Sequence, residues 1–225
     1  MNFFTLPAYC LLSQPVYNAV CTNHLMLGHL LLFVSWIAYY ALHSWLATDG
    51  VKSFMQRSMG RNYRTYRVLY NVKSMVLLLA IVYFHLKLDS PFFMERTLIT
   101  TVLGVLFAVL GSFVLTHAFF TVNLKEFLGL AQLDGEMENS PQAPKRLIRS
   151  GFYAYVRHPF YFGVIMILLG LVLLIPSYAT LMMLLSTMLY LPVGVALEEK
   201  KLIREFGDDY LRYRKEVKAF IPFII

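Results

Sequence analysis

Charged residues are scarce in this chain of 225 residues: they make up 15% of it, whereas apolar residues make up 58%. A soluble domain carries about a quarter charged residues and about half apolar ones. The mean hydropathy is +0.59, and the apolar residues gather in blocks long enough to cross roughly 30 Å of hydrocarbon. This composition excludes a soluble globule and a disordered chain.

Cysteine is also scarce, since only Cys10 and Cys21 occur. Two cysteines in a chain of this length exclude a secreted module held together by disulfides, and the pair itself fits either a disulfide or two thiols. The sequence has no Cys/His cluster with metal-ligand spacing, no glycine-rich phosphate loop and no internal repeat. No metal site is expected.

Five apolar blocks predict an all-α, polytopic integral membrane protein with about five transmembrane helices. The expected spans are 24–48, 66–86, 96–120, 160–175 and 178–197. The fourth is short, about 24 Å at the helical rise per residue, and Pro176-Ser177 turns the chain straight back. The last two spans are therefore expected to form a short helical hairpin, followed by a cytosolic C-terminal helical segment. Residues 1–225 then form a single membrane domain.

Acidic residues are fewer than basic ones, 13 against 20, and the basic residues are unevenly placed. Eighteen of the 20 fall in the first and third loops and the C-terminal tail, and only Lys87 and Arg96 fall on the other side. Because Lys and Arg in short loops stay in the cytosol, we expect an outside N-terminus and a cytosolic C-terminus. The charge is thus explained by membrane orientation, with no nucleic-acid partner. Residues 1–23, which lack Lys and Arg, are expected to form an extracytoplasmic lead-in.

Polar chemistry gathers in two cytosolic stretches, 151–163 and 198–217. In the first, Pro159 suits the first position of a helix, which places Arg157 and His158 at the membrane face beside free helix N–H groups. The second begins with Glu198-Glu199 where a helix leaves the bilayer, and paired carboxylates there are costly without a cation. Alone, these stretches also fit a capped helix start and solvated acids. The hairpin brings them together, so 150–225 is predicted to form one site.

The residues of this predicted site indicate which chemical groups its ligand carries. Arg157 and the helix N–H groups suit a carboxylate, and Glu198 and Glu199 suit a cation or ribose hydroxyls. Tyrosines 153, 155 and 161 offer an aromatic wall, and aromatic faces attract a sulfonium ion as they attract ammonium. S-adenosylmethionine carries all of these groups, and we expect Tyr153 and Tyr161 to contact it.

The motifs in this part of the chain resemble a known superfamily. Residues 157–163 (RHPFYFG), Glu198-Glu199 and residues 206–213 (FGDDYLRY) occur in the order found in isoprenylcysteine carboxyl methyltransferases and phospholipid methyltransferases. The resemblance covers about the last 80 residues. It implies an integral-membrane enzyme that uses S-adenosylmethionine and holds it in the C-terminal part. The residues it implies for the cofactor site are Arg157, His158, Tyr161, Gly163, Glu198 and Glu199.

The three N-terminal spans, 24–120, resemble a narrower branch. His43-Ser44, Tyr70-Asn71 and the segment 123–129 are similar to bacterial methanethiol S-methyltransferases and related denitrification-associated membrane proteins. This resemblance implies a bacterial inner membrane and a small thiol acceptor, methylated to a thioether. His43 and Arg157 are then the candidate catalytic residues, with Tyr70, Asn71 and Glu126 on the substrate side. A histidine satisfied by a helix carbonyl is the alternative for His43.

The sequence is also compatible with other functions. The acceptor could instead be a prenylcysteine carboxylate or a phospholipid amine, and membrane lipids are partners in any case. An NADPH-dependent membrane reductase is a second class, because sterol reductases have a somewhat similar C-terminal end, although they are much longer chains. A non-catalytic membrane assembly protein is a third class. No feature of the sequence bears on oligomeric state.

Overall fold

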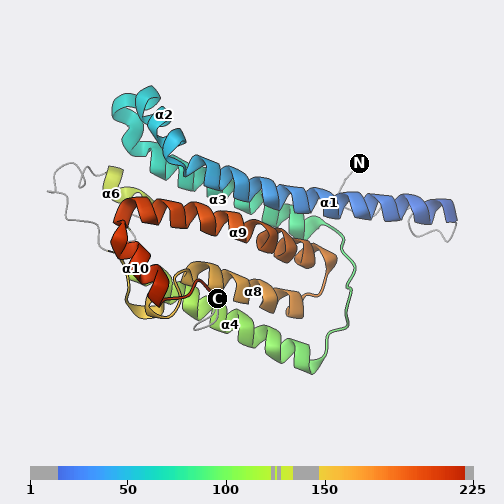
Figure 1. The fold of residues 1–225 in the computed structure, drawn as a ribbon. Helices are drawn as coiled ribbons and strands as arrows, with labels where there is room; N and C mark the ends of the chain where they lie inside the picture. Colours follow the sequence, from blue (N-terminus) through green and yellow to red (C-terminus); the bar gives the residue numbers. More distant parts are fainter. Residues whose placement is uncertain (1–14, 123–124, 126–127, 134–146, 221–225) are drawn as a thin grey trace.

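The computed structural model describes residues 15–122, 125, 128–133 and 147–220. This part of the chain is helical and contains no β-strand, which confirms the predicted all-α class. Figure 1 shows the long helices running roughly along one common direction. In chain order the elements are α1 (Pro15–Leu46), α2 (Asp49–Met59), the 3₁₀ helix η2 (Gly60–Thr65), α3 (Tyr66–Lys87), α4 (Leu98–Thr121), α6 (Leu130–Leu133), the 3₁₀ helix η3 (Gly151–Ala154), α8 (Pro159–Leu174), α9 (Tyr178–Phe206) and α10 (Asp208–Glu216).

Four helical segments of the described chain are long and apolar enough to cross a membrane, and the shorter apolar helix α8 lies beside them. These five elements match the expected spans closely, including the short fourth span and the turn after it. Two boundaries differ clearly: α9 continues beyond the expected end at 197 to Phe206, and α1 begins at Pro15, so the end of the expected lead-in is helical. Proline is tolerated there because the first helical N–H needs no partner. Cys10 and the side chain of Cys21 lie outside the described residues.

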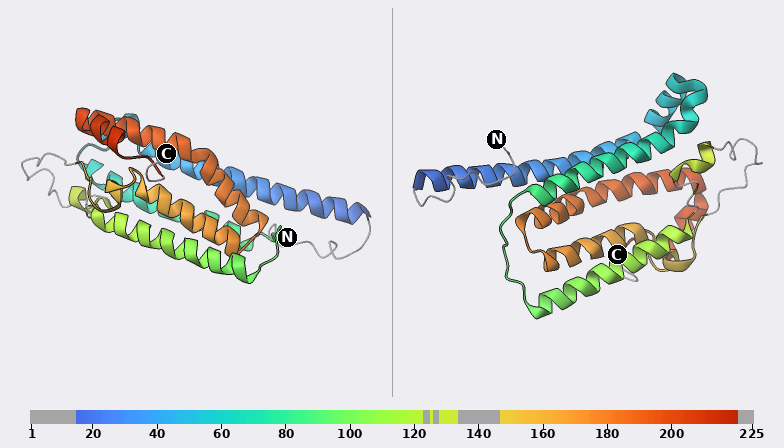
Figure 2. Two further views of the ribbon diagram at one scale, coloured as in Figure 1. Left: turned by 60° about the horizontal axis from the view of Figure 1, so that its bottom comes forward. Right: turned by 180° about the vertical axis from the view of Figure 1, so that it is seen from behind.

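Helix α1 packs against α3 and α9, α9 packs against α8, and α8 packs against α4. In Figures 1 and 2, α1 and α3 lie together on one side of the molecule, α4 lies on the other, and α9 and α8 lie between them. Segments α2, η2, α6, η3 and α10 all lie at one end, and the connection 88–97 runs across the opposite end. The basic loops and tail therefore share one end of the bundle. This is the grouping that the charge pattern predicts.

Helices α4 and α8 pack backbone to backbone through glycines. A Cβ atom on Gly111 would lie 2.6 Å from the carbonyl oxygen of Gly163, and one on Gly170 would lie 2.7 Å from that of Gly104. Small residues at such positions let membrane helices approach closely. Gly163 was expected to line the cofactor site, but the space left by its missing side chain is filled by α4.

Helix α9 joins this pair to α1 and α3. Leu32, Trp36 and Ala179 form a buried cluster between α1 and α9, and Tyr40 shares a hydrogen bond of 2.7 Å with Thr187. At the far end, the Ser90 hydroxyl accepts from the Ala179 amide at 2.8 Å and thereby ties the long connection to the start of α9. The N-terminal spans are thus fixed against the C-terminal hairpin.

Large apolar side chains cover the outside of the bundle. Leu98 is 80% exposed, Phe120 77% and Ile99 71%, and many more lie along α1, α3 and α4. A water-soluble monomer rarely exposes contiguous apolar surface of this extent. Together with the long apolar helices, this surface identifies a multi-pass membrane protein.

Candidate active site

The carboxylate of Glu199 lies at the centre of the cluster formed by the C-terminal part. Arg157 donates to Oε1 from Nη2 at 2.6 Å and from Nε at 3.1 Å. His158 Nε2 lies 3.3 Å from the same oxygen, and Arg214 Nε lies 3.3 Å from Oε2. The side chains of Glu199 and Arg157 are each only 10% exposed. The cluster thus places four nitrogen atoms, from Arg157, His158 and Arg214, around one acid, as a nearly buried carboxylate requires.

The guanidinium of Arg157 also holds the C-terminal segment. Its Nη1 donates to the carbonyl oxygens of Arg214 at 3.0 Å and Val217 at 2.7 Å. With the two bonds to Glu199, four of the five N–H donors of an arginine are used. The contacts give Arg157 a positioning role, and its direct action on a substrate stays a prediction.

The backbone explains how these residues meet. Pro159 is the first residue of α8, as predicted, and His158 is its N-cap. The chain just before it runs beside the segment after α10, where Arg157 N donates to Lys218 O at 2.8 Å and His158 N donates to Ala219 O at 3.1 Å. Gly207, with a φ of 54°, ends α9 and lets α10 turn back. The predicted hairpin and the α10 turn together close the site.

Glu198 is the more open of the two acids. Its side chain is 44% exposed, and its Oε2 lies 3.4 Å from Nδ1 of the buried His158. The hydroxyl of Tyr161 interacts with the same carboxylate. Burial, followed by the charge of Glu198, raises the pKa of Tyr153. Glu198 therefore presents an accessible acceptor beside protonated phenols, which suits a cation or a pair of ribose hydroxyls.

The buried hydroxyl of Tyr210 bears on whether this cluster suits a ligand. Tyr210 is 1% exposed, and its hydroxyl has no hydrogen-bond partner among the described residues. It interacts electrostatically with Glu199, Arg157 and Glu198, and burial followed by Glu199 raises its pKa, so the phenol stays protonated. An unsatisfied buried donor is costly. Such a donor beside acids and aromatic rings fits a polar, cationic cofactor such as S-adenosylmethionine.

Tyr213 has a different role from its neighbour. Its hydroxyl donates to the Tyr153 carbonyl at 2.6 Å, and burial raises its pKa to about 12. The guanidinium of Arg149 lies 5.3 Å from the centre of its ring. Tyr213 therefore fastens α10 onto η3 and does not present a free donor.

A second polar group lies between α1 and α3. The Tyr70 hydroxyl lies 2.8 Å from Nε2 and 3.0 Å from Nδ1 of His43, and Ser74 Oγ lies 3.1 Å from Nδ1. The side chain of His43 is exposed, so a small molecule can reach the ring. Its ring is held by hydroxyl groups of the neighbouring helix, not by a carbonyl of its own helix as in the structural alternative. The structure thus brings two predicted residues, His43 and Tyr70, into contact.

The two remaining substrate-side predictions have different outcomes. Asn71 donates from Nδ2 to the carbonyl oxygen of Leu128 at 2.8 Å, which links α3 to the segment before α6. Glu126 lies outside the described residues. The substrate role of both stays a prediction.

Tyrosines connect the His43 group with the Glu199 cluster. Tyr161, which contacts Glu198, also interacts electrostatically with Tyr70 and Tyr190. Tyr190 in turn stacks on Tyr40, with ring centroids 5.6 Å apart. The two groups therefore face one region of the bundle, where α1, α3, α8 and α9 meet.

Sequence reasoning missed three members of these groups: Ser74, Tyr210 and Arg214. Arg214 lies in a run of exposed charged residues, and Ser74 follows a lysine inside an apolar span. Neither pattern distinguishes them from neighbours. Tyr210 falls in the motif 206–213 and is buried on α10. What distinguishes its hydroxyl is burial without a partner among the described residues.

The fold and these clusters define a class, a multi-pass helical membrane protein with a polar site at the end of a short hairpin, and comparison with known proteins shows which family it resembles. Residues 99–209 match the family model described as phospholipid methyltransferase. This part of the chain is therefore similar to the phospholipid methyltransferases, as the motifs predicted. The match extends over α4, the glycine-packed partner of α8.

Curated relatives carry two kinds of name. The chain is 34% identical over 103 residues to methanethiol S-methyltransferase 1 of Bradyrhizobium diazoefficiens, covering 46% of this chain and 35% of that protein. It is 39% identical over 79 residues to protein-S-isoprenylcysteine O-methyltransferase of Schizosaccharomyces pombe, covering 35% and 34% of the two chains. It is 27% identical over 219 residues to methanethiol S-methyltransferase of Mycobacterium tuberculosis, covering 94% and 81%. The first two matches thus span about a third of each relative, and no solved structure matches the chain significantly.

Proposed function

We propose that this protein is an S-adenosylmethionine-dependent membrane methyltransferase whose acceptor is a small thiol such as methanethiol. The observation that supports it most is the buried Glu199 cluster with the unpartnered Tyr210 hydroxyl beside it. Of that cluster, Arg157, His158 and Glu199 lie within the region matched by the family model, and Tyr210 and Arg214 follow directly after it. The match to a methanethiol S-methyltransferase that covers 94% of this chain supports a thiol acceptor.

The residues that would hold the cofactor follow from the geometry. Glu198 is accessible for a cation or ribose hydroxyls, Tyr210 for a hydrogen bond, and Tyr153 and Tyr161 for aromatic contact. When bound, S-adenosylmethionine supplies a methyl group on a positively charged sulfur. Glu199 and Arg157 hold the ends of α8, α9 and α10 in register around that position.

The N-terminal residues would serve the acceptor. In the transfer, the thiolate sulfur forms a bond to the methyl carbon as that carbon's bond to the sulfonium breaks, which leaves a thioether and S-adenosylhomocysteine. Because the thiolate is the nucleophile, the thiol must first lose its proton. His43, exposed and oriented by Tyr70 and Ser74, is placed to accept it. Holding the two reactants in position and excluding water from the site would each raise the rate further.

Replacing His43 by alanine should slow methyl transfer to a thiol by about a hundredfold, in the range that general bases contribute. Binding of S-adenosylhomocysteine should not change, because His43 lies on α1, apart from the Glu199 cluster. The measurement is single-turnover transfer and calorimetric binding on the same protein. Ser74→Ala is the graded control, since it removes one contact to the ring and leaves the base. Normal turnover of His43→Ala would assign the histidine a structural role.

Replacing Tyr210 by phenylalanine should weaken binding of S-adenosylhomocysteine about tenfold, the cost of one hydrogen bond to a charged or polar ligand. Stability should be unchanged or higher, because the variant removes a buried donor that lacks a partner. Tyr213→Phe is the matched control: it breaks the 2.6 Å bond to Tyr153 and should lower stability by about 1 kcal/mol. If Tyr210→Phe binds as tightly as wild type, the hydroxyl does not contact the cofactor.

The acceptor is tested directly with purified protein in lipid vesicles. Methyl-labelled S-adenosylmethionine is supplied with methanethiol, a prenylcysteine analogue and phospholipid, and volatile label is separated from label in the lipid phase. Volatile label supports the thiol acceptor. Label in the lipid phase would support the same cofactor but would identify a prenylcysteine or a phospholipid as the acceptor. If the protein binds NADPH but not S-adenosylhomocysteine, the result would favour a reductase. If it binds S-adenosylhomocysteine but transfers no methyl group, the result would favour an assembly protein.

One hollow favours a lipid-like acceptor as the second candidate. It measures about 370 Å³, opens beside α4 and η3, and is lined by Phe113, His117, Gly151, Phe152, Ala154 and Tyr155. Its aromatic lining suits a prenyl or acyl chain, and it adjoins the stretch that leads into His158. Narrowing it with Ala154→Leu should reduce transfer to a prenylcysteine or phospholipid and leave transfer to methanethiol unchanged.

The orientation is part of the proposal. An outside N-terminus and a cytosolic C-terminus place the Glu199 cluster in the compartment where S-adenosylmethionine is made. The clustering of α2, α6, η3 and α10 at one end supports this, because these segments adjoin the basic loops. A protease-accessible tag at either terminus of the protein in sealed vesicles tests it.

A further inference from the structure

We infer that α2 and η2 bind the phosphate headgroup of an anionic phospholipid, at a site separate from the proposed active site. These segments, residues 49–65, lie at the end of α1 and α3 and turn aside from the bundle direction (Figures 1 and 2). No residue of either segment is buried. They are therefore a surface element at the depth where two spans end.

The charge of this element is strongly one-sided. Between positions 49 and 67 the sequence contains five basic residues and one acid, Asp49. Asp49 already forms an ion pair with Arg204 of α9, at 2.8 Å. Among the described residues neither Arg61 nor Arg64 has a carboxylate partner. Two neighbouring arginines without a counterion repel one another, and an anion between them would relieve that repulsion.

The backbone directs both arginines to one pocket. Gly60 ends α2 with a φ of 51°, a conformation that favours glycine. The chain then continues as the 3₁₀ helix η2, in which side chains three residues apart lie on the same face. Arg61 and Arg64 have this spacing. Both line a pocket of about 240 Å³, together with Gln56, Gly60 and Tyr63.

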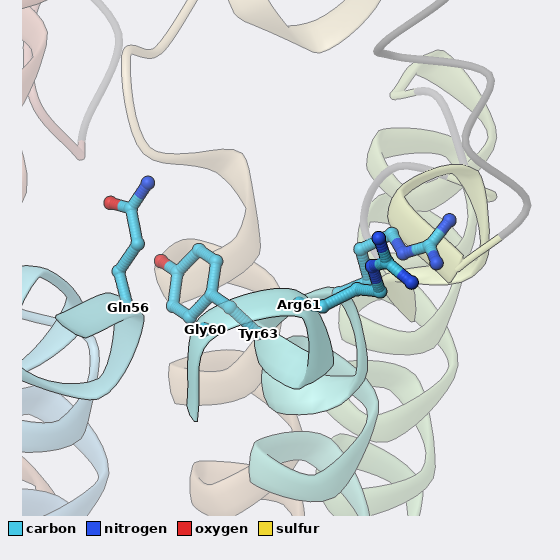
Figure 3. A pocket seen from close by; sticks show the side chains of 5 residues that line it. Gln56, Gly60, Arg61 and Tyr63 are labelled. Atoms are coloured by element: carbon cyan, nitrogen blue, oxygen red, sulfur yellow. The ribbon is translucent and has the colours of Figure 1, made fainter. Parts of the chain in front are cut away.

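The polar groups of this pocket suit a phosphate. Figure 3 shows Gln56 and Tyr63 side by side, and Arg61 extending from η2 in the opposite direction. Arginine binds phosphate oxygens through paired N–H donors, and the glutamine amide and tyrosine hydroxyl add further donors. The pocket has no acidic lining residue, so nothing in it opposes an anion.

The surroundings of the pocket indicate that the phosphate belongs to a lipid. Trp45, at the end of α1, is 59% exposed, and Phe54, on α2, is 61% exposed. Aromatic side chains at the ends of spans lie at headgroup level, and an amphipathic helix beside them lies in the plane of the interface. Basic residues at this depth attract anionic lipid. A headgroup here would also steady α2, which contacts α9 through Asp49 and Arg204.

The test measures lipid retention by the full chain. Delipidated protein in neutral detergent is titrated with phosphatidylglycerol or phosphatidylcholine, and bound lipid is counted by native mass spectrometry. Wild type should prefer phosphatidylglycerol, and Arg61→Gln/Arg64→Gln should bind it at least about tenfold more weakly. The matched control is Lys200→Gln/Lys201→Gln, which removes the same charge from the exposed face of α9 and should bind like wild type.

Three results would overturn the inference. Equal weakening in both double variants would show that only overall charge matters. Equal binding of the two lipids by wild type would show no anionic site. Competition by millimolar inorganic phosphate would identify a soluble phosphate as the ligand. Binding of S-adenosylhomocysteine, measured in parallel, shows that each variant is folded and separates failure here from failure of the proposed activity.

Discussion

Glutamine at position 199 is expected to abolish measurable binding of S-adenosylhomocysteine, a loss on the order of a hundredfold or more. The variant keeps the shape of Glu199 but removes the charge that Arg157, His158 and Arg214 share. Leaving the nearly buried Arg157 guanidinium without its carboxylate costs about 3–5 kcal/mol. Because that guanidinium also holds the carbonyl groups of Arg214 and Val217, α10 should lose its position. Calorimetric titration of monodisperse protein measures the effect.

Two further variants keep this test decisive. Glu216→Gln is the matched control, because Glu216 pairs with Arg149 at an exposed position and such pairs contribute little. It should bind S-adenosylhomocysteine like wild type. If Glu199→Gln does not fold, Glu198→Gln tests the same site, since its side chain is 44% exposed and carries less of the structure. Unchanged affinity in folded Glu199→Gln, or in Glu198→Gln when the first does not fold, would place the cofactor elsewhere.

Alanine at position 111 is expected to destabilise the protein by about 2 kcal/mol, within the range for overpacking. The new Cβ would lie 2.6 Å from Gly163 O and 2.8 Å from Ile167 N. Both are backbone atoms, which cannot rotate away as the tip of a side chain can. Helices α4 and α8 must therefore separate. Unfolding in mixed micelles of increasing denaturing-detergent content measures the change.

Gly50→Ala is the matched control for this substitution. Gly50 lies in α2, and nothing comes within 4 Å of a Cβ placed there. Alanine should stabilise that helix by roughly 0.5–1 kcal/mol, because glycine loses more backbone entropy on folding. Equal stability of Gly111→Ala and wild type would show that α4 and α8 do not pack in the described contact. Because α8 begins directly after His158, Gly111→Ala should also weaken cofactor binding.

The sequence by itself determined the class and most of the architecture. Hydrocarbon thickness sets a length that any spanning helix must meet, so the blocks near 66–86, 96–120 and 160–175 could be recognised without contacts. Pro159 predicted the start of α8 because its ring suits the first helical turn. The start of α1 at Pro15 could not be recognised, since proline is equally compatible with a break and with a first helical residue.

The tertiary structure decided which side chains meet and what each one does. Arg157 was expected to bind a ligand, but the chain crossing after α10 directs its donors to Glu199 and to two carbonyl oxygens. Gly163 was expected at the cofactor, but α4 occupies its open side. Tyr210 carries no distinguishing sequence signal, and only its burial without a partner marks it. Hydropathy acts locally along a chain, whereas a donor's partner depends on segments distant in sequence, which only the packed helices bring together.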